Sequence, residues 1–124
     1  MNDQINFKVL LRSPKYPVIV IADDGLYSAY DNEQLGALCV FSEPFEDDDE
    51  LKVVDSSGAE FIYFSEHTSL MPGILNKRWT KKKLIELYNT SVNAEETNIK
   101  YPLKSISSKK LSRIMGEICE LLKS

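Results

Sequence analysis

The chain has 124 residues, about the size of one domain, with 43% hydrophobic residues, 27% charged residues and a formal net charge of −4. These values exclude a disordered or fibrous protein. The longest apolar stretches, residues 18–22 and 37–41, are much shorter than the ~20 residues of a membrane span, and the first residues lack a secretory pattern. We therefore expect a single domain over residues 1–124, located in the cytoplasm and without membrane contact.

The charge is distributed unevenly along the chain. Residues 1–60 carry 4 Lys and Arg against 13 Asp and Glu, whereas residues 61–124 carry 11 against 6. Such a division indicates either two halves that attract each other in the fold or surfaces that bind charged partners.

Strand signals occupy residues 5–65. Residues 7–12, 18–22 and 37–41 are strand-like, and 18–22 is apolar enough for a central strand buried on both faces. Residues 51–54 and 60–64 flank a turn with Asp, Ser and Gly and predict a hairpin. Residues 27–36 fit either a strand followed by a turn, or a short helix capped by Asp31 with Gln34 at capping-box spacing.

Helix signals follow the strands. Thr80 is predicted to cap a helix over about 81–89, and 89–102 is a long polar connection. Ser107 or Ser108 is predicted to cap a helix over about 108–122, whose apolar stripe is Leu111, Ile114, Met115, Ile118, Leu121 and Leu122. The expected class is α+β, with an antiparallel sheet of about 4–5 strands from residues 5–65 and two helices packed on one face.

Residues suited to catalysis are few. Cys39 and Cys119 are expected to be free, buried thiols, and the single histidine, His67, stands in no recognisable catalytic pattern. The sequence offers too few Cys and His ligands for structural zinc. We therefore expect a protein that is not an enzyme and that uses no cofactor and no metal.

Acidic residues form the most unusual local feature. The run Glu46, Asp47, Asp48, Asp49 and Glu50 lacks the spacing and glycine of a calcium loop, so it reads as a solvated loop or as a contact surface. Asp23 and Asp24 read as a tight turn with Gly25, and Asp31 lies nearby in sequence. These eight residues are the candidate acidic surface for a basic protein partner.

Basic residues form a second candidate surface around the only tryptophan: Lys77, Arg78, Trp79, Lys81, Lys82 and Lys83. A tryptophan among several cations is typical of nucleic-acid binding, although Trp79 is equally consistent with a residue at the edge of the hydrophobic core. Three lysines in the first turn of a helix oppose its dipole, so we expect an anion nearby. That anion could be the acidic run, a partner's carboxylates or a phosphate.

The functional prediction follows by elimination. We expect a non-enzymatic protein-binding domain, of the inhibitor or immunity type, that neutralises a basic toxin or nuclease through its acidic surface. The alternative is a small nucleic-acid-binding module that uses residues 77–83.

Overall fold

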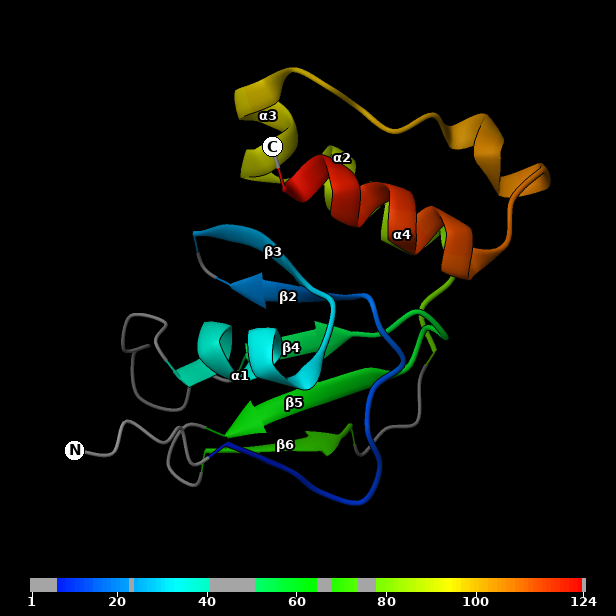
Figure 1. The fold of residues 1–124 in the computed structure, drawn as a ribbon. Coiled ribbons are helices and arrows are strands. Elements are labelled where there is room, and N and C mark those ends of the chain that lie inside the picture. Colours follow the sequence, from blue (N-terminus) through cyan, green and yellow to red (C-terminus); the bar gives the residue numbers. More distant parts are fainter. Residues whose placement is uncertain (1–6, 23, 41–50, 65–67, 74–77, 124) are drawn as a thin grey trace.

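The computed structural model describes residues 7–22, 24–40, 51–64, 68–73 and 78–123. Its elements in chain order are β1 (Lys8–Val9), β2 (Val18–Ala22), β3 (Gly25–Ala29), α1 (Asn32–Val40), β4 (Leu51–Val54), β5 (Glu60–Phe64), β6 (Ser69–Pro72), α2 (Lys81–Asn89), α3 (Val92–Thr97), the 3₁₀ helix η2 (Leu103–Ser107) and α4 (Leu111–Leu122). The predicted α+β class is confirmed (Figure 1).

The strands form one sheet in the order β1-β6-β5-β4-β2-β3. All neighbouring pairs are antiparallel except β1 and β6, which are parallel. Over the described residues the sheet has six strands, slightly more than the 4–5 predicted, because β6 lies beyond residue 65. The first strand is also shorter than the predicted 7–12, since β1 spans only Lys8–Val9.

The predicted hairpin is confirmed as β4 and β5, and Asp55 organises its turn. The Asp55 carboxylate is buried, and it accepts hydrogen bonds from the backbone N–H groups of Ser57 (2.9 Å), Ala59 (2.9 Å) and Lys15 (2.9 Å). These donors satisfy a buried charge that would otherwise be costly. Gly58 takes a φ of 86°, which favours glycine.

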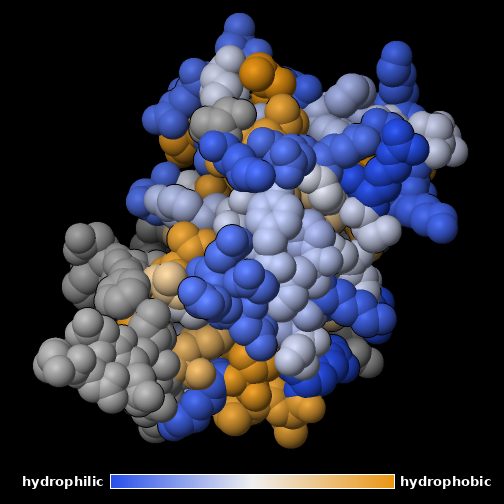
Figure 2. Space-filling model, in the orientation of Figure 1, coloured by the Kyte–Doolittle hydropathy of each residue, from blue (hydrophilic) through white to orange (hydrophobic). Residues whose placement is uncertain are grey.

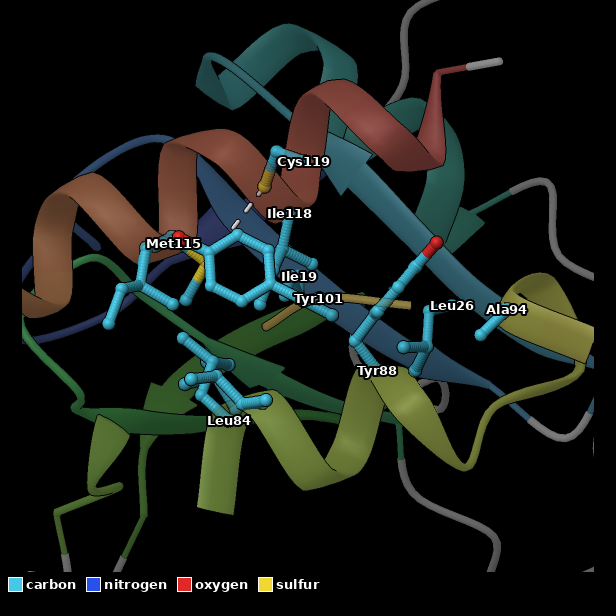
Figure 3. Packing of buried hydrophobic residues seen from close by; sticks show 12 residues of the cluster. Ile19, Leu26, Leu84, Tyr88, Ala94, Tyr101, Met115, Ile118 and Cys119 are labelled. Carbon is cyan, nitrogen blue, oxygen red and sulfur yellow. Dashed lines mark hydrogen bonds between the residues drawn. The ribbon is translucent and has the colours of Figure 1, made fainter. Parts of the chain in front are cut away.

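Both faces of β2 are buried, as predicted. Val18 and Val20 belong to one buried cluster, the α1-side core, together with Leu35 and Cys39 of α1. Ile19 belongs to a second cluster, the helix-side core, with side chains of α2 and α4 such as Leu84, Tyr88, Met115 and Ile118 (Figure 3). The sheet therefore separates two cores, because neighbouring residues of a strand point to opposite faces.

The prediction of a strand over 37–41 is wrong, because residues 32–40 form α1. The Asp31 carboxylate accepts a hydrogen bond from Gln34 N–H (2.8 Å), and the Gln34 side chain accepts one from Tyr30 N–H (2.8 Å). This cap starts a helix that places Leu35 and Cys39 on one buried face. A short apolar run has the same composition in a buried helix and in a buried strand, which explains the error. Both predictions for 27–36, a strand and a helix capped by Asp31, are partly correct, since β3 ends at Ala29 and the capped helix follows it.

The helical region needs two corrections. The predicted connection 89–102 contains α3, which Ser91 caps by accepting a hydrogen bond from Ala94 N–H (3.2 Å). The last helix begins at Leu111 and not at 108, because Leu103–Ser107 forms η2 and Lys110 occupies the N-cap position without a side-chain cap. Its stripe is confirmed, with Ile114, Met115 and Ile118 fully buried. None of the helices in the described part of the chain is long and apolar enough to cross a membrane.

Candidate binding surface at the start of two helices

The first turn of α2 carries three cations. Thr80 is the N-cap, as predicted, and its hydroxyl oxygen accepts a hydrogen bond from Lys83 N–H at 3.1 Å. Lys81, Lys82 and Lys83 therefore occupy the first turn, which contains no acidic residue. Cations at this end of a helix oppose its dipole by about 0.3–1 kcal/mol each when exposed.

No described carboxylate forms an ion pair with these lysines. Lys81 Nζ donates to the carbonyl oxygen of Ile106 at 3.2 Å, and Lys83 Nζ lies 5.2 Å from the centre of the Trp79 ring. Lys82 is exposed. The acidic run 46–50, which the sequence offered as an internal counter-charge, lies outside the described residues. Within the described ranges, the positive charge of this turn is left to solvent or to a partner.

Trp79 lies at the edge of the helix-side core, as the sequence allowed. Its indole Nε1 donates to Glu60 Oε1 at 2.9 Å, and its backbone N–H donates to Gly58 O at 2.8 Å. One face of the ring is taken by Lys83. The indole is thus part of the fold, and stacking of a nucleic-acid base on that face would first require Lys83 to move.

The start of α4 adds further cations at the same end of the molecule. In Figure 1, α2 and α4 begin at the same end, beside the β4–β5 turn. A Cβ atom on Gly58 would meet the Trp79 carbonyl oxygen at 2.8 Å and a methyl group of Leu111 at 3.0 Å, so the turn touches both helix starts. We call this surface the basic end: Arg78, Lys81, Lys82, Lys83, Lys104, Lys109, Lys110 and Arg113. It corresponds to hydrophilic surface at the upper right of Figure 2.

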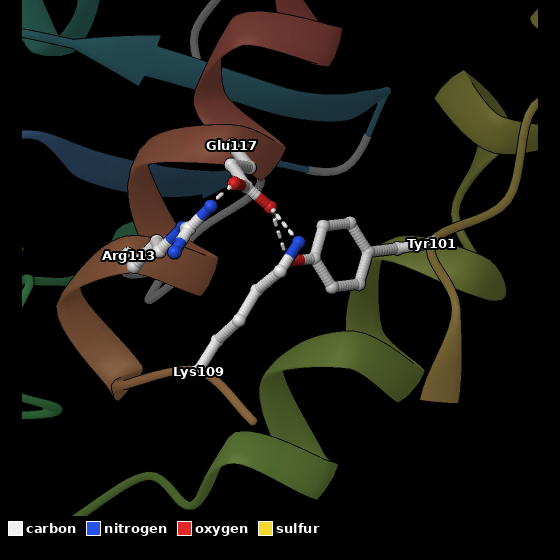
Figure 4. A network of polar contacts seen from close by, with 4 residues as sticks. All are labelled: Tyr101, Lys109, Arg113 and Glu117. Atoms are coloured by element: carbon white, nitrogen blue, oxygen red, sulfur yellow. Dashed lines mark hydrogen bonds and ion pairs between the residues drawn. The ribbon is translucent and has the colours of Figure 1, made fainter. Parts of the chain in front are cut away.

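One carboxylate fixes part of this surface (Figure 4). Glu117 accepts hydrogen bonds from Lys109 Nζ (2.7 Å), Tyr101 OH (2.6 Å) and Arg113 Nε (3.1 Å). The hydrogen bonds from Lys109 and Tyr101 lower the pKa of Glu117 to about 2. The network joins α4 to the segment that leads into it. Within the basic end, only Lys109 and Arg113 pair with a described carboxylate.

The two acidic candidates among the described residues, Asp24 and Asp31, lie apart from each other. Asp24 and Asp31 stand at opposite ends of β3, a five-residue strand about 15 Å long. Asp24 accepts a hydrogen bond from Tyr27 OH at 2.8 Å, and Asp31 caps α1. Gly25 takes a positive φ, as the predicted turn requires. The remaining candidates, Asp23, Glu46, Asp47, Asp48, Asp49 and Glu50, lie outside the described residues, as does Lys77 of the basic set.

The described residues contain no group of His, Cys, Asp and Glu that could hold a metal ion. Cys39 and Cys119 are free and buried, as predicted, and burial raises the pKa of each thiol to about 12. Neither thiol is therefore ionised near neutral pH, which a nucleophile would require. His67 lies outside the described residues.

A cavity of about 470 Å³ opens between α1 and the segment around β1, lined by Phe7, Val9, Ser13, Asn32, Glu33 and Gly36. Beside it, the Tyr16 hydroxyl donates to the Asn32 side-chain oxygen. Burial, with a contribution from Asp31, raises the pKa of Tyr16 to about 12. This lining can hold a small molecule by contact and hydrogen bonds, and among its described residues Glu33 is the only carboxylate.

Sequence reasoning missed several residues that shape these surfaces. Asn93 falls within the predicted polar connection 89–102, and Lys104 is absent from the predicted basic set. The i, i+4 spacing of Arg113 and Glu117 could have predicted their ion pair. The contact of Lys81 with Ile106 had no local signal, since 25 residues separate them.

Comparison with known proteins gives no relative: no family model, no curated protein and no solved structure matches the chain.

Proposed function

We propose that the protein is a non-enzymatic protein-binding domain whose basic end recognises an acidic partner. The observation that carries this proposal is that six of the eight cations there lack a carboxylate partner among the described residues. The side chains of Lys82, Lys104 and Lys110 are exposed and form no ion pair with a described carboxylate. Unpaired charge on one end of a domain speeds encounter with an oppositely charged partner and selects against like-charged ones.

A protein partner fits this surface better than nucleic acid. The whole chain has a net charge of −4, which repels a polyanion longer than the basic end itself. One face of the Trp79 ring, on which a base could stack, is occupied by Lys83. A compact cluster of carboxylates on a folded partner requires only the local cations and no aromatic platform.

Trp79 provides the readout, because it is the only tryptophan of the chain and lies within the basic end. Its fluorescence is titrated with a glutamate-rich peptide and with single-stranded DNA of equal charge. We expect tighter binding of the peptide, and about tenfold weaker binding by Lys82→Glu combined with Lys104→Glu.

The matched control is Lys100→Glu combined with Lys123→Glu, which changes the net charge equally at other positions. An equal loss of peptide affinity in both double variants would show that only the net charge matters and would contradict the proposal. DNA that binds more tightly than the peptide, with a steep salt dependence that weakens in the Lys82 and Lys104 variant, would favour the nucleic-acid alternative.

A second candidate function is the inhibitor or immunity type, in which an acidic surface neutralises a basic toxin or nuclease. One contact favours it: the Asn93 side chain binds the backbone of Leu26, at 2.8 and 3.0 Å, and so holds α3 beside the β2–β3 turn. This brings the exposed Glu95 and Glu96 to the end of the molecule where Asp24 lies.

The test of this second candidate is the association rate with a cationic nuclease. Replacing the acids of residues 46–50 with Asn and Gln should slow association with little change in dissociation. An unchanged association rate would remove the acidic run from the mechanism, and unaltered nuclease activity in the complex would contradict inhibition.

A further inference from the structure

The described helices α2 and α4 cover only part of the width of the sheet face on which they pack. The ladder pairings align Leu26, Ile21, Lys52, Ile62 and Met71 in one row across β3, β2, β4, β5 and β6. Leu26 and Ile21 belong to or pack against the helix-side core. Beyond them, Ile62 and Met71 join neither core and stay partly exposed. The helical layer therefore ends in the middle of the sheet.

The uncovered part is unexpectedly apolar. An antiparallel sheet that faces water on one side normally alternates apolar residues inward with polar residues outward. In β5, however, the outward positions after Glu60 are Ile62 and Phe64. Met71 continues the row, and Leu10, which follows β1 beside β6, is 38% exposed. Apolar surface gathered in this way commonly marks a site of interaction.

Backbone strain lies at the same edge. Leu11 adopts a φ of 71° and is 85% exposed, and Arg12 N–H donates to Leu10 O at 2.8 Å, closing a three-residue turn around it. A γ-turn with positive φ at its centre is rare and strained, and leucine gains nothing from exposure. Figure 2 shows apolar surface along this lower edge, where β1 and β6 lie in Figure 1.

Two cations flank this surface. Lys52 interrupts the row, and Lys8 lies two positions before Leu10 on the same strand face. Both are exposed, and neither forms an ion pair with a described carboxylate. A second copy of the chain packed symmetrically on this face would bring lysine against lysine. The complementary occupant has apolar residues with carboxylates beside them.

We propose that the apolar strip, defined as Leu10, Leu11, Ile62 and Met71, docks an amphipathic acidic helix of a partner protein. Neighbouring strands are spaced about 4.8 Å apart, close to the 5.4 Å pitch of a helix. A helix lying across β5, β6 and β1 places one apolar side chain per turn against Ile62, Met71 and Leu10 in succession. Such a helix continues the layer of α2 and α4 over the part of the sheet that the described helices leave partly exposed.

The probe is a fluorescently labelled helical peptide with leucines along one face and glutamates beside them, titrated by anisotropy. Its counterpart has lysines in place of the glutamates. We expect the acidic peptide to bind, and Leu11→Asp and Lys52→Glu each to weaken it about tenfold or more. Leu11 is almost fully exposed, so the Leu11→Asp variant remains folded and interpretable.

Two controls separate this strip from other surfaces. Val92→Asp introduces the same charge at an exposed apolar residue on α3 and should leave the affinity unchanged. The variant that combines Lys82→Glu with Lys104→Glu reverses two charges of the basic end and should also leave the peptide affinity unchanged, so the two proposals fail independently. Equal binding of the lysine peptide, or self-association of the protein that Leu11→Asp abolishes, would overturn the proposed occupant.

Discussion

The sheet face that carries α2 and α4 is apolar at both β2–β3 and β5–β6, but the described helices cover only the first of these two halves. In the covered half, Ile19, Leu26 and Val54 are at most 4% exposed beneath α2 and α4. In the other half, Ile62 and Met71 are partly exposed although they stand in the same strand register. Alternation along a strand thus predicts which face a residue occupies, whereas burial depends on how far the helical layer extends.

The largest expected difference between the halves is energetic. Ile118→Ala removes a fully buried side chain of α4 above the covered half, so the free energy of unfolding should fall by about 2–5 kcal/mol. Ile62→Ala, the matched change in the uncovered half, should cost about 1 kcal/mol or less, because less apolar area leaves contact with the protein. Urea unfolding measures both. Equal losses would mean that Ile62 is covered in solution.

The next largest effect concerns β3, which is the edge strand of the covered half. The Asn93 amide takes the place of a neighbouring strand by bonding the N–H and the C=O of Leu26. Asn93→Ala leaves both groups without a partner and should cost about 1–3 kcal/mol. The Leu26 amide should also exchange with deuterium faster. Asn93→Asp retains an acceptor for the Leu26 N–H, so its free energy of unfolding should fall less than that of Asn93→Ala. An equally large fall in both variants would contradict this account.

A smaller effect of opposite sign is expected at the edge of the uncovered half. Leu11→Gly relieves the positive φ of Leu11 and should raise the free energy of unfolding by about 1 kcal/mol. Leu10→Gly, the neighbouring change without positive φ, should not stabilise. Thermal unfolding compares the two variants. Loss of stability in Leu11→Gly would show that the leucine side chain makes contacts that outweigh the strain.

The smallest effect is the pH dependence of the helical layer. Hydrogen bonds from Lys109 and Tyr101 lower the pKa of Glu117 from 4.5 to about 2 in the folded protein. The stabilisation is therefore complete above the unfolded value of 4.5, and it is lost as pH falls through about 2. In a plot of the urea unfolding midpoint against pH, the fall at acidic pH should become shallower in Glu117→Gln and should stay unchanged in Glu96→Gln. The same fall in both variants would show that the hydrogen bonds to Glu117 do not cause the pH dependence.

Local signals were enough for a large part of the fold. The β4–β5 hairpin, the Thr80 cap and the α4 stripe each depend on residues a few positions apart, and each was predicted. The start of α4 was misplaced because Ser107 and Ser108 are good capping residues, but η2 uses this segment instead. Of the candidate site, Lys81, Lys82 and Lys83 were predicted on the first turn of α2, whereas Lys104 was missed.

The α+β class, the hairpin, the amphipathic last helix and the concentration of positive charge in residues 61–124 can all be predicted from the amino-acid sequence. Three features appear only in the folded chain: residues 32–40 are helical throughout, Asn93 bonds the backbone of the edge strand β3, and the starts of α2 and α4 form one basic end. The same holds for the apolar strip, which combines β1, β5 and β6. The physical reason is range: caps and periodicity act within a turn or two of chain, whereas burial and surface charge arise from segments tens of residues apart.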